Sequence, residues 1–153
     1  MKAKKSLRLV LGNQLFPFRD QQFNHNETIF MCEDFGLCSY VKHHKSKIAL
    51  FFSAMRSFRD EALRKDLKVI YYEYSQDFNK HYCEKLLETI SSGEFEEVVF
   101  FEIEDKAFEK EIFKFIDKDK ISFIVKPSPM FLDNRESFAE FSREKKFILQ
   151  ANH

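Results

Sequence analysis

The sequence has no tryptophan, and glycine, proline and cysteine each occur only three times in 153 residues. So little glycine and proline excludes a collagen-like chain and a Pro/Gly-rich disordered one. The cysteines are odd in number and show no paired spacing, so we expect no disulfide framework and a reducing cytoplasm. They are Cys32, Cys38 and Cys83.

Net charge and long apolar runs are also missing. The 25 Lys and Arg residues balance the 25 Asp and Glu residues, whereas general polyanion binders usually carry a basic excess. The apolar run near residues 48–53 is far too short to span a bilayer. The basic start and the apolar stretch at residues 7–11 are too short for a signal peptide. We therefore expect a cytoplasmic protein with no membrane partner.

Phenylalanine is abundant, with 20 residues, and hydrophobic residues make up 44% of the chain against 33% charged. These proportions suit one globular domain with a solvated shell. Because aromatic side chains bury large apolar areas, we expect most phenylalanines to fill the core.

Short apolar runs alternate with stretches of helical period along the whole chain. We expect strands at residues 6–12, 28–32, 67–72, 96–102 and 121–125. We expect helices at residues 36–65, 78–91, 106–117 and 134–145, with Gly93 closing the second. This alternation predicts right-handed βαβ crossovers and an α/β fold whose mostly parallel five-stranded sheet is covered on both faces.

The helix expected at residues 36–65 contains no glycine or proline after its first residue, and its apolar residues recur every three or four positions. Four of its side chains then share one face, namely Tyr40, His44, Lys47 and Phe51. A planar heterocycle can stack on the aromatic pair and hydrogen-bond to the histidine or the lysine. A solvated face is the other interpretation of this charged stretch.

Ligands of parallel α/β sheets bind beyond the carboxyl ends of the strands, at a topological switch point. That rule selects the loops at residues 12–19 and 33–40. Gly12 permits close approach of a ligand to the backbone, and Asn13 and Gln14 offer amide donors and acceptors. An ordinary turn explains the same residues, and neither a GxGxxG motif nor a P-loop is present.

The sequence predicts no catalytic residue and no metal site. Ser53 and Ser57 lack the Gly-x-Ser-x-Gly elbow of a nucleophilic serine. His43 and His44 are adjacent, so they project about 100° apart on a helix and do not share a face.

Three segments resemble a known family: residues 9–15 (LVLGNQL), 39–58 (SYVKHHKSKIALFFSAMRSF) and 129–132 (PMFL). They are similar to the N-terminal domain of the photolyase-related proteins. This is the prokaryotic iron–sulfur branch of the photolyase/cryptochrome family, which includes bacterial (6-4) photolyases. The likeness covers nearly the whole chain, and the middle segment is its most specific part.

The resemblance implies a Rossmann-like three-layer sandwich over residues 1–149, followed by a truncated tail at residues 150–153. In the family, an all-helical C-terminal domain holds flavin adenine dinucleotide (FAD), an iron–sulfur cluster and the damaged DNA. The resemblance therefore implies a domain that is not catalytic by itself. Its parent would be a lyase of light-dependent DNA repair or a light-signalling flavoprotein, with the missing helical domain as its partner.

In the family this domain can hold an antenna chromophore, 6,7-dimethyl-8-ribityllumazine, beside the loop after the first strand. By position, the implied pocket consists of Gly12, Asn13, Gln14, Glu33, Tyr40, His44, Lys47 and Phe51. The chain departs from the family pattern at Asn13, where Asp is usual, and at residues 37–38, where an acid is frequent. It also departs at Phe51, where a smaller aliphatic residue is usual.

Two other functions remain open. A docking module would have its pocket filled by Phe51 and would expose an apolar patch that includes residues 147–149. A small stand-alone nucleotide-binding protein would depend on Glu33, His44 or Lys47 in a cleft.

Overall fold

The computed structural model describes residues 4–34, 36, 39, 42–75, 80–133 and 135–143. Its sheet contains five parallel strands in the order β3-β2-β1-β4-β5. The strands are β1 (Ser6–Leu9), β2 (Glu27–Cys32), β3 (Lys68–Tyr72), β4 (Glu97–Phe101) and β5 (Ser122–Lys126). The helices are α1 (Phe18–Gln21), α3 (Lys45–Arg64), α4 (Tyr82–Gly93), α5 (Lys106–Asp119) and α6 (Arg135–Arg143). The predicted five-stranded α/β sheet is confirmed.

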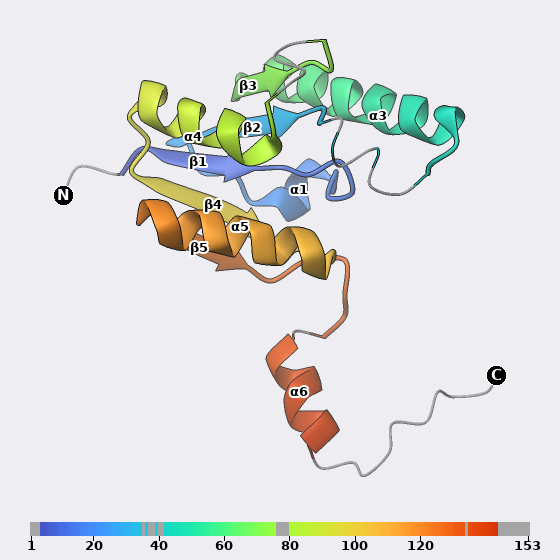
Figure 1. The fold of residues 1–153 in the computed structure, drawn as a ribbon, viewed down its shortest axis with the longest axis vertical. Helices are drawn as coiled ribbons and strands as arrows, with labels where there is room; N and C mark the ends of the chain where they lie inside the picture. Colours follow the sequence, from blue (N-terminus) through green and yellow to red (C-terminus); the bar gives the residue numbers. More distant parts are fainter. Residues whose placement is uncertain are drawn as a thin grey trace.

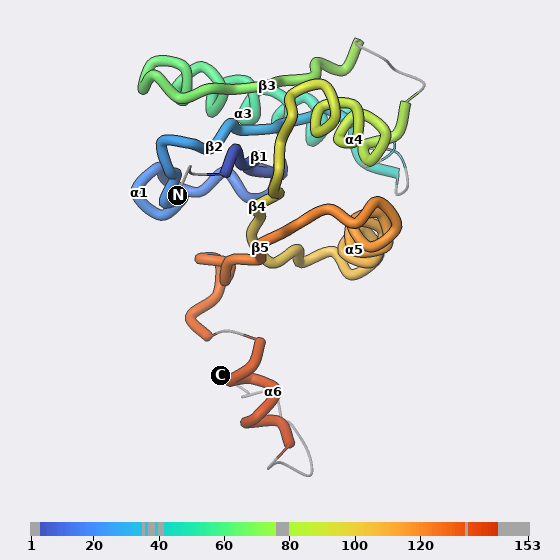
Figure 2. Tube along the Cα trace, turned by 90° about the vertical axis from the view of Figure 1, so that its left-hand side faces the viewer, coloured from blue at the N-terminus to red at the C-terminus, as the bar shows by residue number. Residues whose placement is uncertain are grey.

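Helices cover both faces of this sheet (Figures 1 and 2). Helices α4 and α5 lie on one face, where Leu86 and Ile112 pack against the strands. Helices α1 and α3 lie on the other face, where Met55 and Phe58 of α3 are buried with Ile29 and Met31 of β2. The result is a Rossmann-like three-layer arrangement, in agreement with the sequence.

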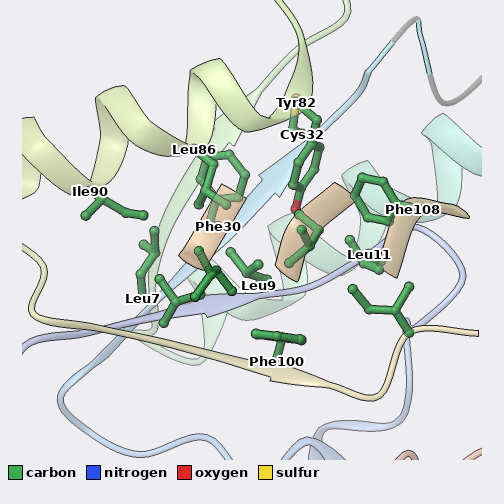
Figure 3. Packing of buried hydrophobic residues seen from close by; sticks show 14 of the residues in the cluster. Leu7, Leu9, Leu11, Phe30, Cys32, Tyr82, Leu86, Ile90, Phe100 and Phe108 are labelled. Atoms are coloured by element: carbon green, nitrogen blue, oxygen red, sulfur yellow. The ribbon is translucent and has the colours of Figure 1, made fainter. Parts of the chain in front are cut away.

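The larger part of the core lies between the sheet and helices α4 and α5 (Figure 3). Tyr82, the first residue of α4, meets Phe30 of β2 edge to face with ring centroids 5.6 Å apart. It meets Phe108 of α5 in the same way at 5.2 Å. Each such aromatic pair adds roughly 0.5–1.5 kcal/mol to the energy of burial. The rings therefore fix both helices to the sheet.

Helix α3 begins at Lys45, so the prediction of one helix from residue 36 to residue 65 was wrong at its N-terminal end. His44 has extended backbone (φ −65°, ψ 137°), and its Nδ1 atom accepts a hydrogen bond from the Ser46 N–H at 3.2 Å. It therefore caps the helix. Of the four residues predicted to share a helix face, Lys47 and Phe51 lie in α3, and His44 precedes the helix as its cap. Tyr40 lies outside the described residues.

Helix α4 ends differently from the prediction that Gly93 closes it. Gly93 is the last helical residue, and Glu94 takes the left-handed conformation (φ 51°). The glycine is needed for a steric reason, because a Cβ atom at position 93 would lie 2.2 Å from the Phe95 ring. Any side chain at position 93 would therefore have to displace the Phe95 ring, which packs onto the end of the helix.

Helix α6 extends away from the sheet (Figures 1 and 2). None of its described residues is buried, and Phe138 and Phe141 are 54% and 51% exposed. Arg135 ties its first turn to α5 through an ion pair with Glu109 and a hydrogen bond to the Ile103 carbonyl. Within the described ranges, no helix is long and apolar enough to cross a membrane.

Candidate functional site

A cavity of about 260 Å³ lies at the carboxyl end of β1, which we call the first cavity. Strand β1 has β2 on one side and β4 on the other. The chain therefore continues from β1 to β2 in one direction along the sheet and from β4 to β5 in the opposite direction. This is the switch point at which doubly wound sheets bind their ligands. The lining residues come from the ends of β1, β2 and β4 and from α3, α4 and α5. They are Val10, Leu11, Gly12, Asn13, Cys32, Asp34, His43, Lys47, Ile48, Phe51, Phe52, Met55, Tyr82, Ile103, Asp105 and Phe108.

Gly12 keeps the floor of this cavity open. A Cβ atom at position 12 would lie 3.0 Å from Met55 Sδ and 3.4 Å from Phe51 Cδ1, both on α3. The first of these distances is tighter than normal packing, so a side chain at position 12 would displace Met55. The glycine at position 12 therefore lets the loop after β1 lie close against α3.

Lys47 and Phe51 stand one turn apart on α3 and both line the first cavity. The Lys47 ammonium lies 6.0 Å from the centre of the Phe51 ring. Asn13 lines the opposite side, where its amide nitrogen donates to Glu104 Oε2 at 3.1 Å. The structure thus brings together four of the residues that the sequence selected, with an aromatic face, a cation and an amide around one space.

Gln14 and His44 are not among the described lining residues. Gln14 is buried, and its amide nitrogen donates to the Glu102 carbonyl at 2.7 Å, which ties the loop after β1 to the end of β4. His44 caps α3, and its neighbour His43 lines the cavity instead. These two residues support the walls of the site.

Glu33, at the end of β2, is also outside the described lining and forms a buried hydrogen-bonded group. Its carboxylate accepts from Arg56, from the Tyr71 hydroxyl at 2.6 Å and from the Tyr74 backbone N–H at 2.8 Å. Burial alone would raise the pKa of Glu33, but these donors together hold it below its ordinary value. Hydrogen bonds to the charged form have this effect.

Sequence reasoning missed the wall that α4 and α5 provide. Tyr82, Asp105 and Phe108 line the first cavity from that side, and Asp34 joins them from the end of β2. Asp34 lies 3.9 Å from the buried ammonium of Lys85. The signal was available, because Asp105 follows the fourth strand and the switch-point rule applies to that strand as well as to the first. Among the described residues no group of three or more metal-ligating side chains gathers.

The fold and the cavity together define a doubly wound α/β domain with an open space where such domains bind their ligands. A sequence model of the deoxyribodipyrimidine photo-lyase-related proteins matches residues 8–153. The chain belongs to this family.

A curated relative is also similar to part of the chain. It is a (6-4) photolyase of Agrobacterium fabrum (strain C58 / ATCC 33970), 44% identical over 68 residues. The matched segment covers 42% of this chain and 13% of that relative.

Proposed function

We propose that this chain is the antenna domain of a photolyase-related flavoprotein, and that its first cavity holds 6,7-dimethyl-8-ribityllumazine. The observation that carries the proposal is the cavity of about 260 Å³ at the carboxyl end of β1, beside which Gly12 brings the loop close to Met55 and Phe51 of α3. The parent would belong to the iron–sulfur branch, with FAD and the cluster in a C-terminal helical domain. It would act on damaged DNA or signal light, and this domain would not itself be catalytic.

The residues around the first cavity fit a planar heterocycle. Phe51 and Met55 offer apolar contact to the ring, and Asn13 and Lys47 offer hydrogen bonds to its edge. When bound, the lumazine supplies light absorption. The residues of this chain bind the lumazine, orient it and exclude water from it. They take part in no covalent chemistry.

The experiment is a fluorescence titration of the purified chain with ribityl-lumazine. Gly12→Val should weaken binding by at least about tenfold, since its side chain enters the cavity. Leu50→Ala is the control, because Leu50 is exposed on α3, the helix that Gly12 faces, and does not line the described cavity. Thermal unfolding of both variants checks that they fold. A folded wild-type chain that binds no lumazine at millimolar ligand would overturn the proposal.

A second function is supported by a different surface. Apolar side chains between β5 and the end of α6 are exposed, namely Met130, Phe131, Leu132, Phe138 and Phe141. We propose that the C-terminal helical domain expected for this family covers them. Residues 147–149, which we expected in the same patch, lie outside the described residues.

Self-association tests this docking surface. The isolated chain should dimerise or bind a hydrophobic dye through the patch, and Phe138→Ser with Phe141→Ser should reduce both. Leu50→Ser on α3 is the control, because it removes an exposed apolar residue elsewhere. A wild-type chain that stays monomeric and binds no dye would contradict the proposal.

A further inference from the structure

Glu104 gathers polar side chains beside the first cavity, although it is not among the described lining residues. It follows β4, the strand that lies between β1 and β5. Its Oε2 atom accepts hydrogen bonds from the side-chain amides of Asn13 and Gln14, at 3.1 Å in each case. Its Oε1 atom accepts from the hydroxyl of Ser128, also at 3.1 Å. One carboxylate therefore joins the loops that follow β1 and β5.

This carboxylate determines which way the amide of Asn13 faces. An ionised carboxylate only accepts hydrogen bonds, whereas a side-chain amide has a nitrogen that donates and an oxygen that accepts. The nitrogen of Asn13 must therefore face Glu104, as the structure shows. Asn13 also lines the first cavity. Its amide oxygen is then the polar atom that remains for a ligand.

Gln14 supports this arrangement from behind the cavity wall. It is 1% exposed, and its amide nitrogen donates to the Glu102 carbonyl at 2.7 Å as well as to Glu104. Its backbone N–H donates to the Leu11 carbonyl at 2.9 Å, which closes a turn after β1. The loop that carries Asn13 is thus held at both its backbone and its side chains, and the amide of Asn13 is presented in one orientation.

We propose that Glu104 is a positioning residue, which holds Asn13 as a hydrogen-bond acceptor toward the first cavity, and that the cavity thereby selects heterocycles with a ring N–H donor. This inference rests on the proposed antenna function. It adds to that function the polarity of the ligand edge that Asn13 recognises.

An imide edge has the chemistry that this site requires. In 6,7-dimethyl-8-ribityllumazine the ring donor is the N3–H group, which lies between two carbonyl groups. Asn13 offers an acceptor for the N–H group, and Lys47, which lines the same cavity, offers donors for a carbonyl oxygen. A methyl group on N3 removes the donor and leaves both carbonyl groups in place.

Fluorescence titration with the 8-ribityl compound and its 3-methyl derivative tests the selection. We expect the wild-type chain to bind the N3–H compound at least about tenfold more tightly, because a site that accepts from an N–H group disfavours an analogue without it. Glu104→Met removes the carboxylate and frees the amide of Asn13 to turn, so the preference should fall to within about threefold. Glu61→Met is the control, since it removes an exposed carboxylate of α3 away from the cavity.

An exchange of the two groups gives a sharper test. Asn13→Asp combined with Glu104→Gln keeps the net charge, and the new amide at position 104 can donate to the new carboxylate at position 13. The other carboxylate oxygen still accepts toward the cavity, so the preference for the N3–H compound should recover to at least about fivefold. Glu104→Gln alone permits both orientations of the Asn13 amide and should give a weaker preference than the exchange.

NMR of the ligand-free chain measures the orientation directly. The side-chain amide protons of Asn13 should change chemical shift in Glu104→Met and keep it in Glu61→Met. Thermal unfolding checks that each variant folds, and Glu104→Gln decides the question if Glu104→Met does not fold.

Two results would overturn this inference and leave the antenna function standing. One is equal affinity of the wild-type chain for the two ligands. The other is an undiminished preference in the folded Glu104 variants, which would show that the 3-methyl group is excluded by its size alone. Absence of binding by both ligands would overturn the antenna function itself.

Discussion

Arg56 holds Glu33 through two parallel hydrogen bonds, from Nε to Oε1 at 2.6 Å and from Nη2 to Oε2 at 2.8 Å. The Glu33 side chain is 0% exposed, whereas that of Arg56 is 45% exposed. The pair joins α3 to the end of β2, and Tyr71 ties the same carboxylate to β3. It therefore sets the position of the helix that carries Lys47 and Phe51.

This asymmetry predicts unequal effects on stability. Arg56→Gln should lower the free energy of unfolding by about 3 kcal/mol, because it leaves the fully buried Glu33 carboxylate without its cation. Glu33→Gln should cost only about 1–2 kcal/mol, since the amide oxygen still accepts hydrogen bonds and water reaches the Arg56 charge that remains. Urea denaturation of both variants measures the difference, and equal losses would contradict it.

Stability should also fall in acid, and the sign follows from the pKa of Glu33. That pKa is lower in the folded chain than the ordinary value, which is about 4.3 in model peptides. The ionised group therefore stabilises the fold above that pH, and the contribution is lost as the pH falls through the folded value. Denaturation midpoints measured between about pH 6 and pH 3 should drop less steeply in Glu33→Gln. Parallel curves would exclude this role.

Gly93 should be intolerant of a side chain. Because a Cβ atom would lie 2.2 Å from the Phe95 ring, Gly93→Ala should cost about 1–3 kcal/mol through overpacking. Adding Phe95→Leu should recover part of that loss, and Phe95→Leu alone separates the two effects. A double variant whose loss equals the sum of the single losses would show that the contact is not the cause.

Arg8 is a buried cation whose replacement should stabilise the protein. It is 0% exposed, and Nε and Nη1 have no partner among the described residues. Its guanidinium lies 4.2 Å from the centre of the Phe101 ring, which is worth about 2 kcal/mol. Unpaired buried N–H groups cost about 1–3 kcal/mol each. Arg8→Met keeps the contact with the ring and should raise the unfolding free energy by about 1 kcal/mol.

The same substitution should change a second group. Burial first, and then the nearby Arg8 charge, lower the pKa of Lys126. Arg8→Met should therefore raise the pKa of Lys126, which NMR titration of its side chain can follow. Arg8→Ala, which leaves a hole, is the control expected to destabilise. A loss of stability in Arg8→Met would show that the hydrogen bond from Arg8 Nη2 to the Gln21 carbonyl, at 3.3 Å, outweighs the cost of the two unpaired N–H groups.

A substitution at Phe51 tests whether its ring is a surface on which the lumazine stacks or a side chain that fills the cavity. If the lumazine stacks on its ring, Phe51→Leu should weaken binding by about fivefold or more. Leu50→Ala again serves as the neighbouring control. Tighter binding by Phe51→Leu would show that the ring obstructs the cavity and would favour the docking function.

The strand and helix order was predictable from sequence because the parallel strands are short apolar runs, and β1, β2 and β4 are almost entirely buried. The start of α3 was not, since hydrophobic periodicity does not reveal that His44 caps a helix with its own ring nitrogen. Glu33 was selected for its place in a switch-point loop, but its partners Arg56 and Tyr71 come from distant parts of the chain. Tyr82 was not selected, because nothing in the sequence distinguishes it from a core aromatic residue, yet the structure places it in the wall of the first cavity.

The central position of β1 has a consequence for synthesis. Its residue Ser6 pairs in register with Glu97 of β4, 91 residues later. A ribosome that adds roughly 5–20 residues per second needs several seconds to supply that second neighbour. Until then, one edge of β1 stays open to other nascent chains, so chaperone protection matters most for this segment.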